Sequence, residues 1–186
     1  MRRWRAAMVF GVAVAAAAFV ACSSDDESPV SATSALQATS AEVERSDPAP
    51  EIQLELFGNS NHTAGESFAL SDVVGKPAVV NFWYPSCPPC RLEMPDFEAK
   101  SKEHPDVEFV GVMSLILDTV EDGQEFVDEF GLTYRIGPDP ENAVIDYSVI
   151  GFPTSVFLDK DHNVVTKWTG ALNAEKLEEL IQEVLP

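Results

Sequence analysis

Two cysteines separated by two prolines, Cys87-Pro88-Pro89-Cys90, occur where a short apolar run meets a helical pattern. The run at 78–83 (AVVNFW) has the length and composition of a buried strand. Residues 88–103 have a helical pattern that contains Pro95. A CxxC at such a strand-to-helix junction is typical of a redox pair.

Two other roles for these cysteines fit the sequence less well. A closed structural zinc site takes four ligands, whereas the chain has one further cysteine and three scattered histidines. A structural disulfide across a four-residue loop stabilises a fold by only about 2 kcal/mol, against about 3 kcal/mol for a 15-residue loop. We therefore expect a redox couple with neither a metal nor another cofactor.

The position of the pair at a helix N-terminus predicts the role of each cysteine. Cys87 is expected to cap the helix as the more exposed sulfur and to be the nucleophile, because the positive helix end favours a thiolate. Cys90, one turn further in, is expected to be shielded and to resolve the mixed disulfide. Pro88 and Pro89 supply no N–H donors to the thiolate, which favours a reducing pair.

The rest of the chain from about residue 51 alternates strand and helix patterns. This order predicts an α/β sheet covered on both faces. Strands are expected at about 52–56, 78–83, 107–113, 155–158 and 164–168. Helices are expected at 88–103, at 120–130 with Gly131 as the stop signal, in a short segment that ends near Tyr147, and at 174–184. A loop is expected at 137–140.

These motifs resemble the thioredoxin superfamily, and more closely its TlpA-like and ResA-like branch of membrane-tethered thiol-disulfide oxidoreductases. The resemblance covers residues 51–186 and rests on the CxxC, on Phe82-Trp83, on Glu93 with Pro95, and on Gly151-Phe152-Pro153-Thr154. It implies a thioredoxin-like central mixed sheet with helices on both faces and an N-terminal strand extension. The 63 positions from Cys90 to Pro153 match the extra helix and strand that this branch inserts.

The same resemblance implies further site residues. The Phe152-Pro153 bond should be cis, and Phe152, Pro153 and Trp83 should face the substrate, although a strand aromatic such as Trp83 could equally belong to the core. The buried aspartate of thioredoxin, six residues before the nucleophile, is Asn81 here. Glu93 is therefore the candidate acid/base, with a solvated first-turn carboxylate as the alternative.

One departure concerns the surface beside the cysteines. The residue before the first cysteine, commonly Trp in the superfamily, is Ser86 in this chain. The shape of the substrate-facing surface is therefore expected to differ from that of the superfamily's usual members.

The N-terminus predicts export and lipid anchoring. Arg2, Arg3 and Arg5 precede an uncharged run at 6–20, and Phe19-Val20-Ala21-Cys22 resembles the lipobox of bacterial lipoproteins. We expect a lipoprotein signal peptide at 1–21, a lipid anchor on Cys22, and a disordered tether at 22–50 that is rich in Ser, Ala, Thr and acidic residues. An uncleaved membrane helix, or ordinary cleavage that leaves Cys22 free, are the alternatives.

Charge and family resemblance together define the expected function. A net charge of -19 argues against nucleic acid as a partner. We expect a lipid-anchored enzyme on the extracytoplasmic face of a bacterial cell membrane that reduces disulfides in extracytoplasmic proteins, such as the haem-attachment cysteines of apocytochromes c, and is itself reduced by a membrane-bound electron donor. The alternatives are a copper-binding assembly module, which would favour CxxxC spacing, and a thiol peroxidase.

Other polar residues have simpler interpretations. The acidic residues at 118–129 are expected on the solvent-exposed face of a helix, and the alternative is that they bind a basic partner. His104, near a helix C-terminus, and His162, in a hairpin turn, are expected to face solvent.

Overall fold

Strand β3 (Ala78–Trp83) lies at the centre of the sheet, with all six residues buried. In the computed structural model, which describes residues 47–139 and 142–186, β3 pairs in parallel with β4 (Glu108–Met113) and antiparallel with β6 (Thr154–Leu158). Outer strands β5 (Arg135–Pro138) and β7 (Val164–Thr169) complete the order β5-β4-β3-β6-β7. The sheet is therefore mixed, as predicted.

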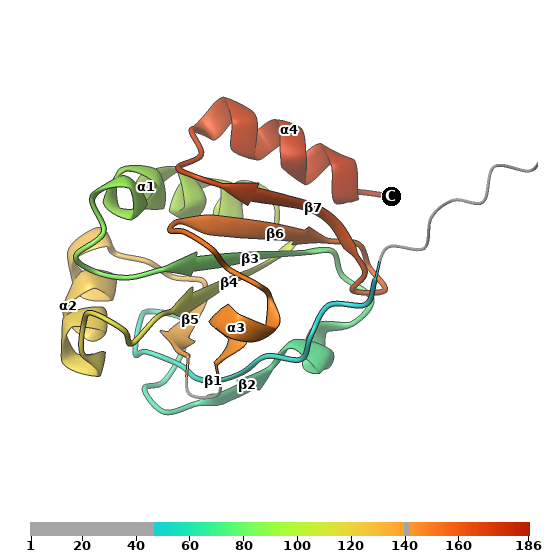
Figure 1. Cartoon of the computed structure of the whole chain (residues 1–186). Coiled ribbons are helices and arrows are strands. Elements are labelled where there is room, and N and C mark those ends of the chain that lie inside the picture. Colours follow the sequence, from blue (N-terminus) through green and yellow to red (C-terminus); the bar gives the residue numbers. More distant parts are fainter. Residues whose placement is uncertain (1–46, 140–141) are drawn as a thin grey trace, which may run out of the picture. The chain divides into compact units, whose positions relative to one another are not determined.

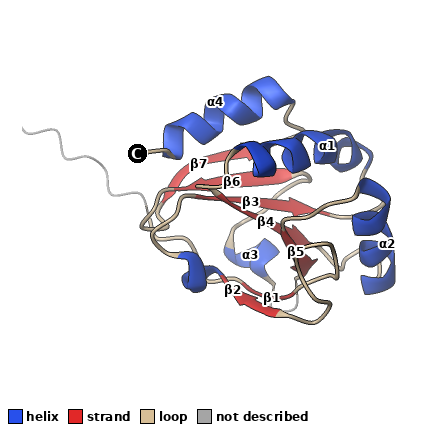
Figure 2. Cartoon of the chain, turned by 180° about the vertical axis from the view of Figure 1, so that it is seen from behind, coloured by secondary structure: helices blue, strands red, loops and turns tan. Residues whose placement is uncertain are grey.

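The two faces of the sheet are covered by different elements (Figures 1 and 2). Val79 and Trp83 belong to an apolar cluster that includes residues of the helices α1 (Pro88–Glu103), α2 (Val120–Phe130) and α4 (Ala174–Val184). Ala78, Val80 and Phe82 belong to a second cluster with residues of the N-terminal strands and of α3 (Ala143–Asp146). The alternation along β3 thus decides which side chains lie beneath α1.

An N-terminal hairpin extends the fold, in agreement with the expected strand extension. Strand β1 (Gln53–Glu55) pairs antiparallel with β2 (Ser67–Ala69), and a 3₁₀ helix, η1 (Leu70–Val73), follows. The backbone N–H of Phe57 donates to the carbonyl of Ile136 at 2.9 Å, which joins the hairpin to β5.

The fold begins before residue 51, where the sequence patterns predict its start. The N–H of Ala49 donates to the His162 carbonyl at 2.9 Å, and the N–H of Val164 donates to the Asp47 carbonyl at 3.0 Å. Residues 47–50, which we assigned to the tether, are therefore part of the fold. The predicted signal peptide, Cys22 and the tether up to residue 46 lie outside the described residues.

The three longer helices have the predicted bounds because each has local start or stop signals. Thr119 and Asp122 form a capping box at the start of α2, and Gly131 ends it in the left-handed conformation. The predicted loop at 137–140 was wrong in its first half, because Gly137 and Pro138 belong to β5. In the described part of the chain, no helix has the length and apolar character needed to span a membrane.

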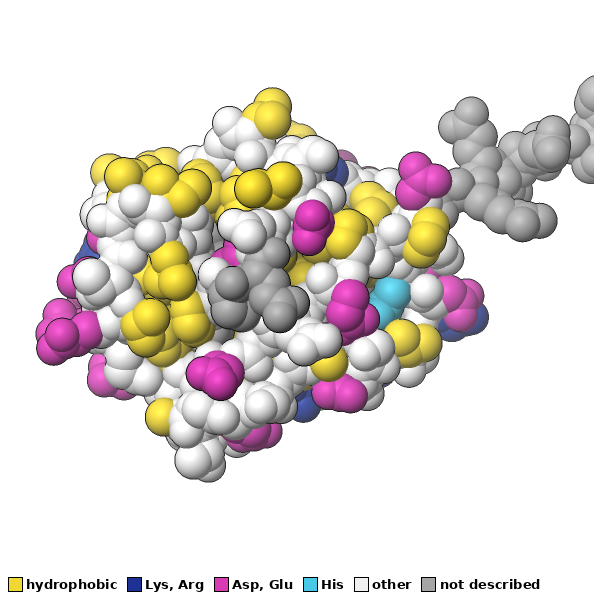
Figure 3. Space-filling view, turned by 60° about the horizontal axis from the view of Figure 1, so that its bottom comes forward, with side chains coloured by type: hydrophobic (Ala, Val, Ile, Leu, Met, Phe, Trp, Pro, Cys, Tyr) yellow, Lys and Arg dark blue, Asp and Glu magenta, His cyan; other side chains and the backbone are white. Residues whose placement is uncertain are grey.

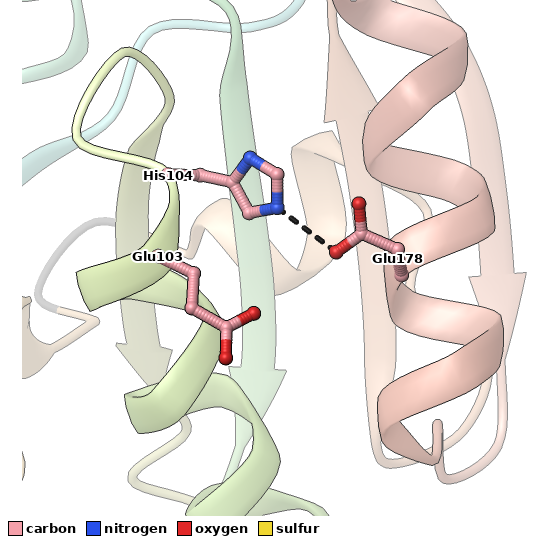
Figure 4. Close-up of side chains that lie close together, drawn as sticks. All are labelled: Glu103, His104 and Glu178. Atoms are coloured by element: carbon pink, nitrogen blue, oxygen red, sulfur yellow. Dashed lines mark hydrogen bonds and ion pairs between the residues drawn. The ribbon is translucent and has the colours of Figure 1, made fainter.

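An ionic cluster joins the C-terminal end of α1 to α4 (Figure 4). His104 Nε2 lies 2.9 Å from Glu178 Oε2, and Lys100 Nζ contacts Glu178 at 2.8 Å and Glu103 at 2.6 Å. The hydrogen bond from Lys100 is the main reason that the pKa of Glu178 falls to about 2. The ammonium group of Lys100 pairs with both carboxylates and so links α1 to α4, and we interpret the cluster as a structural clamp.

The solvent-facing prediction was wrong for both histidines. The side chain of His104 is mostly buried in the clamp between α1 and α4. His162 is buried, with a left-handed backbone conformation, and its Nε2 lies 3.2 Å from the Lys76 carbonyl.

Candidate active site

Cys87 and Cys90 form a disulfide at the start of α1, with an S–S distance of 2.05 Å. Cys87 is the N-cap, as predicted, and its Sγ accepts a hydrogen bond from the N–H of Cys90 at 3.2 Å. The expected exposure of Cys87 was wrong: it is 1% exposed, and Cys90 is fully buried. Both cysteines belong to the apolar cluster of Trp83, against which Phe152 packs, and this packing covers Cys87 in the disulfide form.

The first turn of α1 offers few donors to a Cys87 thiolate. Pro88 and Pro89 occupy the first two helical positions and have no N–H. Helix N-termini stabilise anions largely through these free N–H groups. Within the described residues, the N–H of Cys90 is the only donor to Cys87 Sγ.

Glu93 is a buried carboxyl group one helical turn after Cys90. It is 1% exposed, so the alternative of a solvated side chain is wrong. Its Oε1 accepts from Asn81 Nδ2 and its Oε2 from the N–H of Leu172, both at 2.9 Å. Loss of solvation on burial raises its pKa to about 7, and the two hydrogen bonds only partly oppose this shift. Glu93 can therefore exchange a proton near neutral pH.

Asn81 is an additional polar residue of the site. Its Nδ2 donates to Glu93 Oε1 and to Ser155 Oγ, at 2.9 Å and 3.0 Å. Its Oδ1 is buried and has no hydrogen-bond partner within the described residues. From the sequence, Asn81 was recognised only as the residue that replaces the buried aspartate of thioredoxin, and Ser155 and Leu172 were not expected in the site. These two residues are 74 and 79 positions away from their partners in sequence.

The predicted substrate-facing residues divide into two groups. The Phe152–Pro153 bond is cis, and the register that sets Thr154 opposite Phe82 places Pro153 at the cysteine end of β3. Phe152 is partly buried and meets Tyr84 edge-to-face, with ring centroids 5.2 Å apart. Phe152 and Pro153 therefore lie near the cysteine end of β3, with Pro153 buried and Phe152 partly exposed, and their contact with substrate stays a prediction.

Trp83 is a core residue, so its predicted role in substrate binding was wrong. Its side chain is fully buried and packs on Phe126 of α2, with ring centroids 4.5 Å apart. The physical reason is that α2, a helix of the insertion, covers this face of β3. Sequence alone did not reveal that contact.

The surface beside Cys87 contains contacts that sequence reasoning missed. The exposed Ser86 donates through its hydroxyl to Asp118 Oδ2 at 2.8 Å. Arg91 pairs with Glu129 at 2.5 Å, and its guanidinium lies 5.1 Å from the centre of the Phe126 ring. The segment that precedes Cys87 is thus tied to the loop before α2, and the first turns of α1 are tied to α2 itself.

Comparison with known proteins places this geometry in a family. Residues 46–169 match the AhpC/TSA family. The thiol-disulfide oxidoreductase ResA of Oceanobacillus iheyensis is 34% identical over 144 residues, which cover 75% of this chain and 72% of that protein. The ResA of Halalkalibacterium halodurans is 33% identical over 125 residues, which cover 66% and 70%.

A solved structure of similar fold is also a disulfide oxidoreductase. A secreted disulfide oxidoreductase of Mycobacterium tuberculosis, homologous to E. coli DsbE, has a TM-score of 0.60 at 27% identity and covers 70% of this chain and 94% of that one. The family match over most of the described residues and the identity to ResA proteins agree with the motifs around the disulfide. This chain belongs to the AhpC/TSA family of thioredoxin-like proteins and is a thiol-disulfide oxidoreductase of the ResA type.

Proposed function

We propose that this protein reduces disulfides in extracytoplasmic proteins, with the haem-attachment cysteines of apocytochromes c as one such substrate. The first turn of α1, where Pro88 and Pro89 have no N–H, supports this direction of electron transfer. A poorly stabilised thiolate makes the dithiol less stable relative to the disulfide. The protein therefore tends to give its electrons to other disulfides.

The exchange proceeds in two steps. The thiolate of Cys87 attacks one sulfur of the substrate disulfide, forms a mixed disulfide, and releases the other substrate sulfur as a thiolate. The thiolate of Cys90 then attacks Cys87 Sγ and releases the second substrate sulfur. Two electrons pass to the substrate, and the protein is left with the Cys87–Cys90 disulfide.

Glu93 supports the second step as a base. The thiol of Cys90 must lose its proton in a buried setting, where the neutral form is favoured. Glu93 lies one helical turn away with a pKa of about 7, so near neutral pH a large fraction of it is ionised and able to accept that proton.

The leader and the relatives support the proposed location. The basic leader with Cys22 supports a lipid anchor on the extracytoplasmic face of a bacterial membrane, and a structural relative is secreted. After each turnover, a membrane-bound dithiol donor restores the reduced state.

Replacement of Cys22 by Ser should release the chain from the membrane fraction. If the Cys22→Ser chain keeps its leader and stays with the membranes, the leader itself is the anchor.

The direction of transfer is tested by the reduction potential. Equilibration of the full chain with glutathione buffers should give a value nearer to the roughly -270 mV of thioredoxin than to the roughly -120 mV of a strong periplasmic oxidant. The variant Pro88→Ala/Pro89→Ala should raise the potential because it restores two N–H donors, whereas the distant Pro105→Ala should not. A wild-type value above about -180 mV contradicts the proposal.

A trapping experiment identifies the substrates and tests the alternatives. The Cys90→Ala chain cannot resolve mixed disulfides and should accumulate them with extracytoplasmic proteins that contain cysteine pairs. Rapid turnover of hydrogen peroxide, or retention of Cu(I) without trapped proteins, would instead favour the peroxidase or the copper-binding function.

A further inference from the structure

Three consecutive aliphatic residues are exposed near the active site. Leu115, Ile116 and Leu117, here called the aliphatic loop, connect β4 to α2 and are 43%, 73% and 68% exposed. Runs of exposed aliphatic side chains are unfavourable in water and generally mark a contact surface.

Both ends of the aliphatic loop are tied to the segment that leads into Cys87. On one side, the N–H of Ser114 donates to the Trp83 carbonyl at 2.8 Å. On the other side, Asp118 accepts the hydroxyl of Ser86 at 2.8 Å. The loop is therefore held beside the redox pair by contacts at both of its ends.

A hollow of about 230 Å³ lies next to this loop, and half of the residues that line it are acidic. Asp118, Asp122, Glu125 and Glu129 line it together with Arg91, and we call it the acidic hollow. The guanidinium of Arg91 is engaged by Glu129, which leaves an excess of negative charge. A hydrogen bond from Thr119 lowers the pKa of Asp122, so this carboxylate stays ionised at neutral pH.

The space-filling view shows hydrophobic and acidic side chains close together on the side of the molecule where α2 lies. In Figure 3, hydrophobic side chains gather on the left of the face, and Asp and Glu side chains lie at its outer left edge. An apolar area bordered by an excess of negative charge fits a partner that has apolar side chains and positive charge.

We propose that the aliphatic loop and the acidic hollow dock a cysteine-containing segment of the substrate protein that carries aliphatic side chains and Lys or Arg residues close to its cysteines. The inference rests on the proposed function, because the docked segment must contain the disulfide that Cys87 attacks. The aliphatic loop binds the apolar side chains, and the hollow binds the basic ones and speeds encounter.

Charge argues against the other occupants. An anionic lipid surface would be repelled by the carboxylates of the hollow. A second copy of this chain, with its net charge of -19, would also be repelled. A basic polypeptide is the occupant whose charge is complementary to this surface.

The test uses the reduced full chain and two synthetic peptides that share an internal disulfide and the same aliphatic residues. One peptide has Lys beside its cysteines, and the other has Glu. At low salt, the second-order rate of reduction should be at least about five-fold higher for the Lys peptide, and the preference should largely disappear in 0.5 M NaCl. Hydroxyethyl disulfide, too small to contact the surface, serves as the reference substrate.

Matched variants locate the effect. Glu125→Lys should abolish the preference for the Lys peptide, whereas Asp161→Lys, the same change of charge in the turn at the other end of β6, should retain it. Ile116→Ser/Leu117→Ser should slow the reduction of both peptides about five-fold, whereas Val74→Ser, which alters an exposed residue before β3, should not. All variants should reduce hydroxyethyl disulfide at the wild-type rate.

Several results would overturn the proposal. Equal rates with both peptides, or equal effects of Glu125→Lys and Asp161→Lys, would exclude the acidic hollow as the contact. The variant Ile116→Ser/Leu117→Ser is also compared with its parent in a chain that carries Cys22→Ser. If it binds anionic vesicles more weakly but reduces both peptides at unchanged rates, the aliphatic loop binds lipid instead. Wild-type protein that reduces hydroxyethyl disulfide but neither peptide would contradict both this inference and the proposed function.

Discussion

Glu93 gives the active site a proton acceptor that titrates near neutral pH. Its replacement by Gln keeps the shape and removes the titration. Asn81 can rotate its amide so that the unpaired Oδ1 accepts from the new Nε2, while the N–H of Leu172 still donates to the remaining oxygen. In stopped-flow measurements, release of substrate from the mixed disulfide should slow about ten-fold or more in Glu93→Gln.

The same experiment has a control. Glu98 is also a largely buried carboxylate of α1, but it binds Thr133 and Lys102 and not the redox site. Glu98→Gln should therefore leave the rate of resolution and its pH profile unchanged. An unchanged rate and pH profile in Glu93→Gln would mean that water accepts the proton of Cys90.

The raised pKa of Glu93 also makes stability depend on pH. The folded chain holds this proton up to about pH 7, whereas the unfolded chain loses it near pH 4.5. Stability from this group is therefore complete below about pH 4.5 and falls as the pH rises to 7, by about 3 kcal/mol. Urea unfolding between pH 5 and 8 should show Glu93→Gln gaining stability over the wild type as the pH rises. A constant difference between the two chains would show that Glu93 is already ionised in the fold at pH 5.

At the level of elements, Gly137 allows the N-terminal hairpin to approach β5. A Cβ at this position would lie 2.6 Å from the backbone oxygen of Glu55, and a backbone atom cannot move aside as a flexible side chain can. Gly137→Ala should therefore destabilise the fold by about 2 kcal/mol in urea unfolding. In Gly151→Ala the nearest atom would be a Thr169 methyl at 3.4 Å, so a much smaller loss is expected. Equal stabilities would mean that β1 shifts without cost.

The elements also show what sequence can and cannot predict. The bounds of α1, α2 and α4 follow from local signals, such as the cysteine cap of α1 and the capping box and terminal glycine of α2. The resemblance implied an inserted strand, but its position at β5 was not predicted, because Gly137 and Pro138 suggest a loop, whereas an edge strand tolerates proline. The cis Phe152–Pro153 bond was implied by family resemblance, and neither periodicity nor composition indicated it.

In the site, the limit of prediction was contact between distant segments. Glu93 could be selected because it follows Cys90 by one turn of the same helix. Burial beneath other elements raises its pKa, and its hydrogen-bond partners Asn81 and Leu172, which partly oppose that rise, also come from other elements. The interior position of Trp83 likewise depends on α2, and the clamp that holds His104 depends on α4.

At the level of the whole molecule, charge repulsion opposes the compact state. The chain has 31 acidic and 12 basic residues, and its exposed ion pairs, such as Lys160–Asp161, contribute little stability. Salt screens the general repulsion together with these weak pairs, and the repulsion is the larger effect because most carboxylates have no basic residue to pair with. Raising NaCl from 0.02 M to 0.3 M at pH 7.5 should therefore raise the midpoint of thermal unfolding by about 3 °C, equivalent to about 1 kcal/mol. Glu93→Gln should keep this salt response, because its carboxyl group is buried and makes its contacts inside the fold. A midpoint that falls with NaCl would show that the ion pairs, the α1–α4 clamp foremost, contribute more to stability than the repulsion costs.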